Sequence, residues 1–319
     1  MLVTGGAGFI GSHLCEALLR SGHQVVALDN FLTGRPDNIA HLEREPGFTL
    51  MKGNVCEPPD LEAKAIFHLA SPASPTKYDR YPVETLRANA EGTYRLLELA
   101  RARGARFLLA STSEVYGDPL EHPQREDYAG NVDSVGPRSC YDEGKRYAEA
   151  LTVTYVRHHG VDARIVRIFN TYGPCSDPED GRVIPQFVVQ ALRGEPITVH
   201  RPGTQTRSLC YVSDLVEGLV RAMFRPSTAG QVYNLGNPEE HSVREFAEMV
   251  KRLAKSASPI VLVEGREADI ARRCPDIGKA RSELGWSPLV SLEEGLQSTI
   301  EWFRDLLGRA HPAQRQARA

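Results

Sequence analysis

Two side chains capable of proton transfer stand four positions apart in the segment Tyr141-Asp142-Glu143-Gly144-Lys145. On a helix, residues at i and i+4 share one face, so the phenol of Tyr141 and the ammonium of Lys145 are expected to lie together. A nearby positive charge favours the phenolate, and the spacing therefore predicts a lowered pKa for Tyr141. Such a tyrosine can accept the proton of a hydroxyl group while a hydride leaves the same carbon. The alternative is an ordinary pair on the surface of a helix.

A glycine-rich loop near the start of the sequence predicts a dinucleotide site. A short apolar run leads into Gly5-Gly6-Ala7-Gly8-Phe9-Ile10-Gly11, whose glycines allow a tight turn and close approach of the backbone to a diphosphate. The helix that follows would point its N-terminus at the phosphates. The next predicted strand ends at Asp29, where a carboxylate would bind a ribose 2′-hydroxyl and repel a 2′-phosphate. The pattern favours NAD over NADP, and its alternative is a plain glycine turn with a surface aspartate.

The elements that would position these groups alternate through the first half of the chain. Apolar runs at 2–4, 24–29, 49–52, 65–69, 106–111 and 163–169 predict strands, and amphipathic stretches at 12–21, 83–103 and 141–158 predict helices. This alternation predicts an α/β fold with a Rossmann-like doubly wound parallel sheet. Ligands would then bind at the carboxyl ends of the strands.

A change of composition near residue 170 predicts a second lobe, because Gly, Pro, Asp and Arg become frequent there. We expect residues 1–170 to form an NAD-binding Rossmann domain, with one strand returning to the sheet near 232–235. Residues 171–306 would mainly form a smaller C-terminal substrate-binding lobe. Residues 307–319 lack apolar periodicity and are expected to form a flexible tail.

The overall composition argues against several classes of protein. A formal net charge of -3 favours neither nucleic acid nor an anionic membrane as a partner. The sequence has no apolar run of about 18 residues and no recognisable signal peptide, so a membrane span is not expected. Six cysteines without a CxxC pair, and ten histidines without an HExxH motif, predict free thiols in a reducing cytoplasm and no metal site.

Several longer runs of residues are similar to those of one enzyme family. They are HLASPASP at 68–75, LASTSEVYGD at 109–118, GPRSCYDEGKR at 136–146, RIFNTYGP at 167–174, QTRS at 205–208 and RRCPDI at 272–277. On these runs, residues 1–305 resemble the extended short-chain dehydrogenases/reductases. Within the nucleotide-sugar branch of that superfamily, the chain resembles the UDP-glucuronate decarboxylases, also called UDP-xylose synthases.

The triplet Thr112-Ser113-Glu114 favours this subclass. Related 4,6-dehydratases resemble Thr-Asp-Glu at these positions, with the aspartate as the acid that expels a 6-hydroxyl. The 4-epimerases usually carry a small residue in place of Glu114. A 4-epimerase, a 4,6-dehydratase and a non-catalytic dinucleotide-binding sensor remain as alternatives, although such sensors typically lack the tyrosine or the lysine of the pair. Glu114 could also be a buried structural carboxylate.

The resemblance implies NAD-dependent decarboxylation of UDP-glucuronate to UDP-xylose, with Ser113 and Lys145 in the catalytic set. Tyr141 would accept the proton of the 4-hydroxyl while NAD takes hydride from C4, which creates a β-keto acid. After loss of CO2, Thr112 and Tyr141 would hydrogen-bond the ketone oxygen. Glu114 and Arg273 would serve decarboxylation and protonation of C5. Bound NADH would then reduce C4 to give UDP-xylose, whereas its early escape would leave the 4-keto pentose as product.

The same resemblance assigns two binding sites. The cofactor site would comprise Tyr141 and Lys145 with Gly5, Gly8, Phe9, Ile10, Gly11, Asp29, Asn30, Thr33, Gly34, Asn54, Val55, Leu69, Ala70, Ser71 and Asn89. The UDP-sugar site would comprise Asn170, Tyr172, Arg182, Phe187, Arg207, Tyr211 and Arg273. Core packing is the alternative for Phe187 and Tyr211, and a phosphate contact is the alternative for Arg273.

Two further expectations come from the resemblance. Asn54 and Cys175 stand where family members usually carry an aspartate and an arginine. The cysteine lies on the substrate side and leaves the nucleotide of the substrate open. A homodimer is expected, in which the helices at 83–103 and 141–158 of two subunits would form a four-helix bundle. Burial of these helices against the sheet of their own subunit is the alternative.

Overall fold

The computed structural model of the protein describes residues 1–264 and 272–310. Its centre is a seven-stranded sheet with the order β11-β6-β5-β4-β1-β2-β3, and every neighbouring pair of strands runs parallel. The strands are β1 (Leu2–Thr4), β2 (Val25–Asp29), β3 (Phe48–Lys52), β4 (Ala65–His68), β5 (Arg106–Thr112), β6 (Ala163–Ile168) and β11 (Val232–Leu235). Apart from the added β11, this is the strand order of the Rossmann fold. The predicted fold class is confirmed, and so is the return of a strand at 232–235.

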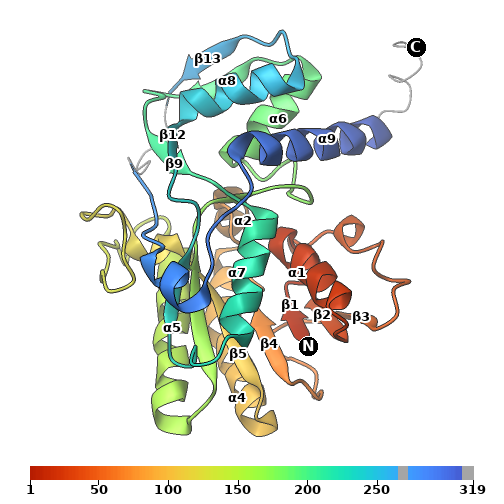
Figure 1. Ribbon diagram of the computed structural model, residues 1–319, viewed down its shortest axis with the longest axis vertical. Helices are drawn as coiled ribbons and strands as arrows, with labels where there is room; N and C mark the ends of the chain where they lie inside the picture. Colours follow the sequence, from red (N-terminus) through yellow and green to blue (C-terminus); the bar gives the residue numbers. More distant parts are fainter. Residues whose placement is uncertain (265–271, 311–319) are drawn as a thin grey trace.

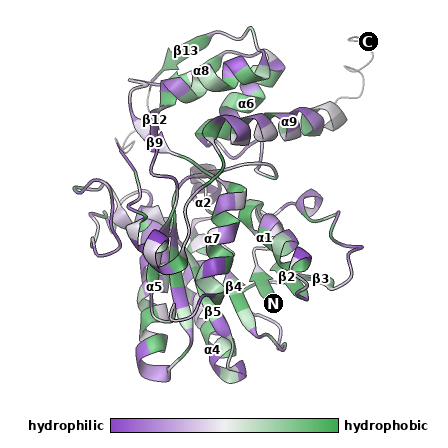
Figure 2. Ribbon diagram, in the orientation of Figure 1, coloured by the Kyte–Doolittle hydropathy of each residue, from purple (hydrophilic) through white to green (hydrophobic). Residues whose placement is uncertain are grey.

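Two helical layers cover the sheet (Figure 1). On one face, α1 (Phe9–Arg20) packs beside α7 (Val212–Phe224), and the other face carries α4 (Thr93–Arg103) and α5 (Ser139–His159). The central strands are mainly apolar because both of their faces are buried (Figure 2), and polar residues stand at their ends, such as His68 in β4 and Arg106 in β5. The helix predicted at 83–103 is divided into α3 (Pro82–Arg87), a π-helical turn (Ala88–Gly92) and α4.

The second lobe lies over the carboxyl edge of the sheet, at the top of Figure 1. It contains α6 (Val183–Arg193), α8 (Val243–Ala254) and α9 (Leu292–Ala310), with β8 (Ile197–His200) paired to β13 (Ile260–Val263) and β9 (Thr206–Ser208) paired to β12 (Glu240–Ser242). Its own core includes Phe187, Phe246 and Phe303, which are fully buried. Because α9 continues to Ala310, residues 307–310 are helical, and the rest of the expected tail lies outside the described residues.

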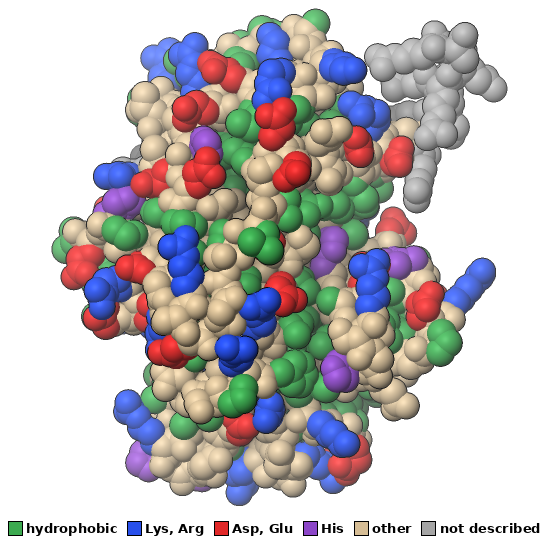
Figure 3. Space-filling model, in the orientation of Figure 1, with side chains coloured by type: hydrophobic (Ala, Val, Ile, Leu, Met, Phe, Trp, Pro, Cys, Tyr) green, Lys and Arg blue, Asp and Glu red, His purple; other side chains and the backbone are tan. Residues whose placement is uncertain are grey.

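Several shorter elements complete the two lobes. They are α2 (Pro75–Arg80), the 3₁₀ turns η1 (Pro36–Asn38) and η3 (Ser113–Tyr116), the π-helical turn η4 (Ala280–Leu284), and the parallel pair β7 (Thr171–Tyr172) and β10 (Cys210–Tyr211). Charged side chains of both signs are interspersed over the face drawn in Figure 3. All six cysteines are free, and no helix among the described residues has the length and apolar character needed to cross a membrane.

Candidate active site

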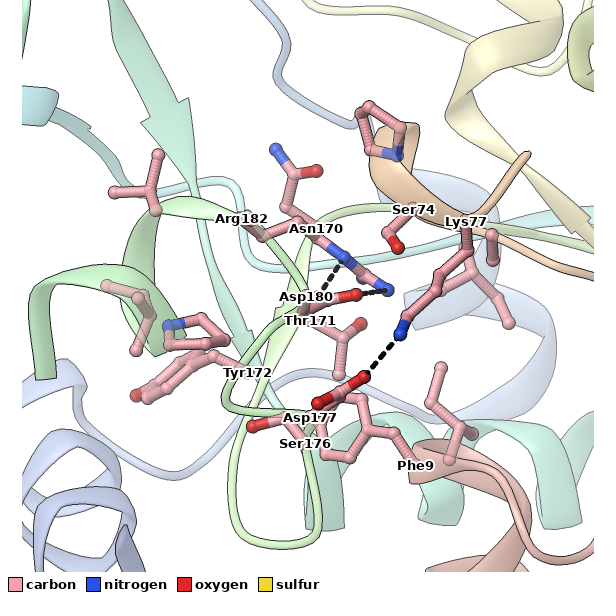
Figure 4. Close-up of a pocket in the computed structure, with 18 of the residues that line it drawn as sticks. Phe9, Ser74, Lys77, Asn170, Thr171, Tyr172, Ser176, Asp177, Asp180 and Arg182 are labelled. Carbon is pink, nitrogen blue, oxygen red and sulfur yellow. Dashed lines mark hydrogen bonds and ion pairs between the residues drawn. The ribbon is translucent and has the colours of Figure 1, made fainter. Parts of the chain in front are cut away.

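A cavity of about 400 Å³ lies between the two lobes, above the carboxyl ends of the strands. Its walls come from the glycine loop, from the ends of β4 and β5, from α2 and α5, and from the second lobe through the segment after β7, α6, β8 and β9. Figure 4 shows part of this lining. The fold therefore brings groups that are distant in the sequence to one cavity.

The glycine loop forms the turn between β1 and α1 and requires its glycines. Gly5 has a φ of +70°, and a Cβ atom on it would stand 2.9 Å from the Cα atom of Ala70. A Cβ atom on Gly11 would stand 2.0 Å from the carbonyl oxygen of Gly5. The amide of Gly8 donates to that same oxygen at 3.0 Å, so the turn closes tightly just before α1 begins at Phe9.

The carboxylate of Asp29 is held at the end of β2, close to this turn. It accepts hydrogen bonds from the amide of Ala7 at 2.9 Å and from the amide of Phe31 at 2.8 Å. Burial raises the pKa of Asp29, against the effect of these hydrogen bonds. Gly34 must lack a side chain because a Cβ atom there would stand 2.7 Å from the carboxylate. A glycine cradle at a helix N-terminus with a carboxylate beside it fits a dinucleotide with a free ribose 2′-hydroxyl.

Tyr141 and Lys145 lie on α5 and are both buried against the cavity. The ring of Tyr141 stacks on Tyr78 with 5.2 Å between the ring centroids. The ammonium of Lys145 donates to the carbonyl oxygen of Ala110 at 2.7 Å and lies 6.0 Å from the centroid of the Tyr141 ring. The predicted juxtaposition on one helix face is thus present.

The pKa predicted for Tyr141 is wrong in its direction. Burial raises the pKa of this phenol and outweighs the hydrogen bond with Thr112 and the charges of Arg182 and Arg138, which act to lower it. The ammonium of Lys145, whose charge was expected to lower this pKa, donates to the Ala110 carbonyl instead. Burial also lowers the pKa of Lys145 to about 8, against the charge of Glu149.

Glu114 is the centre of a charged cluster beside the tyrosine. It lies in η3, directly after β5, and its amide donates to the hydroxyl of Thr112 at 3.2 Å. One carboxylate oxygen pairs with Arg273 and the other with Arg138. Arg273 also donates to the carbonyl of Gly117 at 3.2 Å, and burial lowers the pKa of Arg273 to about 10. Two residues far apart in the sequence, Glu114 and Arg273, therefore meet as the resemblance implied.

Two members of this cluster, Arg138 and Asp142, were not predicted as site residues. Arg138 lines the cavity, and its Nε atom lies 3.7 Å from a carboxylate oxygen of Asp142. The other oxygen of Asp142 is buried without a hydrogen-bond partner among the described residues, and burial raises the pKa of Asp142 to about 6. The position of Arg138 inside the GPRSCYDEGKR run, three residues before Tyr141, is a signal that could have suggested it.

The predicted cofactor residues divide into two groups. Those that line the cavity are Gly5, Gly8, Phe9, Ile10, Gly11, Thr33, Leu69, Ser71, Tyr141 and Lys145. Asp29, Asn30, Gly34, Asn54, Val55, Ala70 and Asn89 stand outside this lining. Asn89 lies in the π-helical turn and donates to the hydroxyl of Ser71 at 2.9 Å, so it contacts a residue of the lining.

The predicted substrate residues are mostly gathered at the same cavity. Asn170, Tyr172, Arg182, Phe187, Arg207 and Arg273 line it, as do Thr112, Ser113 and Glu114. Arg182 is held by Asp180, with its Nε atom 2.6 Å from a carboxylate oxygen (Figure 4). Tyr211 does not belong to the lining, and its ring packs against that of Tyr172, with 5.5 Å between the centroids. This ring contact is of the kind that core packing, the alternative for Tyr211, would make.

One cluster of potential metal ligands exists among the described residues, outside the cavity lining. His122, Glu240 and Cys274 bring one ligand atom each within 4.8 Å of one another. The guanidinium of Arg272 already contacts this cluster, at 2.9 Å from the ring of His122 and 3.2 Å from Glu240. Arg272 thus supplies a positive partner to Glu240 within this cluster.

Comparison with known proteins gives concordant results. Residues 1–236 match the NAD dependent epimerase/dehydratase family. Curated relatives include UDP-glucuronic acid decarboxylase 1 of Danio rerio, 52% identical over 95% of this chain and 72% of the relative, and UDP-glucuronic acid decarboxylase 6 of Arabidopsis thaliana, 53% identical over 97% and 90%.

Solved structures of similar fold are also related in sequence. They include UDP-glucose 4-epimerase of Thermotoga maritima with UDP-glucose, with a TM-score of 0.86 and 30% identity over 96% of this chain and 99% of the other. UDP-glucuronic acid 4-epimerase of Bacillus cereus, in complex with UDP-glucuronic acid and NAD, gives a TM-score of 0.86 and 29% identity over the same shares.

The buried lysine makes stability depend on pH. Because burial lowers the pKa of Lys145 from 10.5 to about 8, the folded protein binds fewer protons than the unfolded chain between these values. Stability from this group therefore increases as the pH rises through that window. We predict that the free energy of unfolding of the wild type, relative to Lys145→Met, increases by at least about 1 kcal/mol from about pH 7 to about pH 10. Urea unfolding of both proteins measures it, and a difference independent of pH would contradict the burial argument.

Proposed function

This chain belongs to the NAD dependent epimerase/dehydratase family, and on that premise we propose that it is an NAD-dependent UDP-glucuronate decarboxylase that forms UDP-xylose. The curated relatives that carry the decarboxylase name match 95–97% of the chain at about half identity. The observation that carries the proposal is the cluster around Glu114, in which the Glu114 carboxylate and two guanidinium groups lie beside the tyrosine–threonine pair.

The first half of the proposed reaction uses Thr112, Tyr141 and Lys145. In its phenolate form, Tyr141 accepts the proton of the 4-hydroxyl, and Thr112, which hydrogen-bonds the phenol oxygen, keeps that oxygen directed at the sugar. When bound, NAD supplies a hydride acceptor at C4 and, once reduced, a hydride donor at the same carbon. The raised pKa that burial gives Tyr141 favours the protonated phenol once the proton has been accepted, so the proton stays on Tyr141 until the ketone is reduced.

The second half of the reaction belongs to the cluster. A ketone at C4 makes the C6 carboxylate part of a β-keto acid, so the electrons of the C5–C6 bond pass to the ketone oxygen as CO2 leaves. Thr112 and the protonated Tyr141 hold that oxygen by hydrogen bonds. Arg273 and Arg138 supply positive charge near the leaving carboxylate, and Glu114, between them, serves the protonation of C5.

A 4-epimerase needs no group for loss of CO2 or for protonation of C5, since its sugar keeps the C5–C6 bond. A direct test therefore incubates the protein with NAD and UDP-glucuronate and resolves the products by mass spectrometry. We expect a product lighter by one CO2. A product of unchanged mass would identify an epimerase and overturn the proposal.

Two variants separate the two halves of the reaction. Tyr141→Phe should slow both oxidation of C4 and release of CO2 by about 10²–10⁴-fold, because the proton acceptor is lost. Glu114→Gln should still produce the absorbance of the reduced nicotinamide in a single turnover, while CO2 release slows. Equal loss of both signals in Glu114→Gln would show that the glutamate acts only on the structure of the site.

A homodimer is the second part of the proposal. Val83 and Leu86 on α3, Tyr94 on α4 and Tyr147 on α5 are large hydrophobic side chains with 42–62% of their surface exposed. They belong to helices that contact one another, so one apolar face of α3, α4 and α5 is available to a second copy. Sedimentation should give a dimer for the wild type and a monomer for Leu86→Glu. A monomeric wild type would contradict the proposal.

The cytoplasm is the compartment that the thiol chemistry favours. Four of the six free cysteines are buried, where a disulfide with a partner would require the structure to open. Fractionation of the source cells should recover the protein with cytoplasmic markers, and recovery from an oxidising compartment would contradict this assignment.

A further inference from the structure

The segment 173–182, which joins β7 to α6, forms one wall of the cavity. Cys175, Ser176, Asp177 and Asp180 all line it, and the side-chain amide of Asn38 donates both to Ala7 of the glycine loop and to Cys175 of the segment. A dinucleotide in the cradle of that loop would lie against this segment. For a bound dinucleotide to leave the cavity on this side, the segment 173–182 would have to move away from the first lobe.

Neutral hydrogen bonds attach the segment to the first lobe through its backbone. The ring of His13 lies 2.9 Å from the carbonyl oxygen of Pro174, and Asn38 donates to the carbonyl of Cys175 at 3.1 Å. The hydroxyl of Thr76 on α2 donates to the carbonyl of Asp180 at 3.0 Å. The first lobe therefore meets both ends of the segment.

A charged contact joins the middle of the segment to α2. The ammonium of Lys77 lies 2.8 Å from a carboxylate oxygen of Asp177, and both side chains are 23% exposed (Figure 4). Burial acts to raise the pKa of Asp177, but the pairing with Lys77 and the hydrogen bond from the amide of Glu179 outweigh it and lower that pKa. A pair with this degree of burial is screened by salt less than the exposed pairs of the surface.

We propose that the Lys77–Asp177 ion pair is a latch that holds the segment 173–182 closed over the reduced cofactor and so determines which product is released. The proposal rests on the proposed function. With the latch closed, NADH remains to return hydride to C4 while Tyr141 returns the proton, which gives UDP-xylose. If NADH leaves first, the ketone cannot be reduced, and the balance is UDP-glucuronate plus NAD to UDP-4-keto-pentose, CO2 and NADH. Lys77 and Asp177 are positioning residues in this account.

The first measurement follows NADH dissociation alone, without turnover. Preloaded NADH is displaced by excess NAD in a stopped-flow instrument while the nicotinamide fluorescence is recorded. Asp177→Asn and Lys77→Met should each release NADH about 10-fold faster than the wild type, which corresponds to about 1.4 kcal/mol. The double swap Lys77→Asp/Asp177→Lys should recover slow release, because the pair is restored with its charges exchanged.

A matched control uses an ion pair outside the cavity lining. Arg252 and Glu293 join α8 to α9 at 2.9 Å, with side chains 58% and 55% exposed. Arg252→Gln should leave NADH release unchanged. Release as slow as wild type in both Asp177→Asn and Lys77→Met would overturn the latch, and so would fast release that the charge swap fails to slow.

A second readout tests the effect on the product. With UDP-glucuronate and NAD, the share of 4-keto pentose, lighter than UDP-xylose by two hydrogen atoms, should rise in Asp177→Asn. An unchanged share despite faster NADH release would overturn the link to product choice. The two proposals fail differently, because an absence of decarboxylation in the wild type would refute the function while the dissociation rates still decide the latch.

Discussion

The parallel direction of neighbouring strands is the constraint on which the rest of the structure depends. Because β1, β4, β5 and β6 run the same way, their carboxyl ends lie at one edge, and the segments that follow each of them reach a single cavity. The turn after β1 supplies the cradle, η3 after β5 supplies Glu114, and the segment after β7 closes the far wall. The second lobe lies over the same edge and adds Arg207 and Arg273, so no one region of the sequence contains the site.

Burial of charge is the electrostatic consequence of this arrangement. Lys145 is removed from water and retains one backbone acceptor, which is why its pKa falls to about 8. Glu114 is compensated by two arginines, and this is the favourable way to bury a carboxylate. In a cavity of this kind, hydrogen bonds and charges act on the reacting sugar more strongly than in water. Burial of the charged groups Lys145 and Glu114 opposes folding, and the proposed chemistry uses these same groups.

The sequence predicted the parts of the structure that follow from local pattern. The strands at the centre of the sheet are continuous apolar runs, and the Tyr141–Lys145 face follows from helical spacing. The meeting of Glu114 with Arg273 came only from family resemblance, because no local rule joins residues so far apart. Spacing could not reveal that Lys145 turns to the Ala110 carbonyl, nor that Arg138 shares Glu114, since both depend on side-chain directions inside the assembled cavity. For Tyr211 the residue type alone could not decide between a nucleotide site and core packing, because it suits both equally.

The central claim is that UDP-glucuronate is oxidised at C4, loses CO2 and is reduced again at C4 in one cavity, with the same bound nicotinamide. The most direct measurement uses UDP-glucuronate that carries deuterium at C4, with the product resolved by mass spectrometry. The account predicts UDP-xylose that has lost CO2 and has kept its deuterium at C4, because the label passes to the nicotinamide and returns. UDP-xylose without the label would contradict the claim, as would a product that keeps its carboxylate.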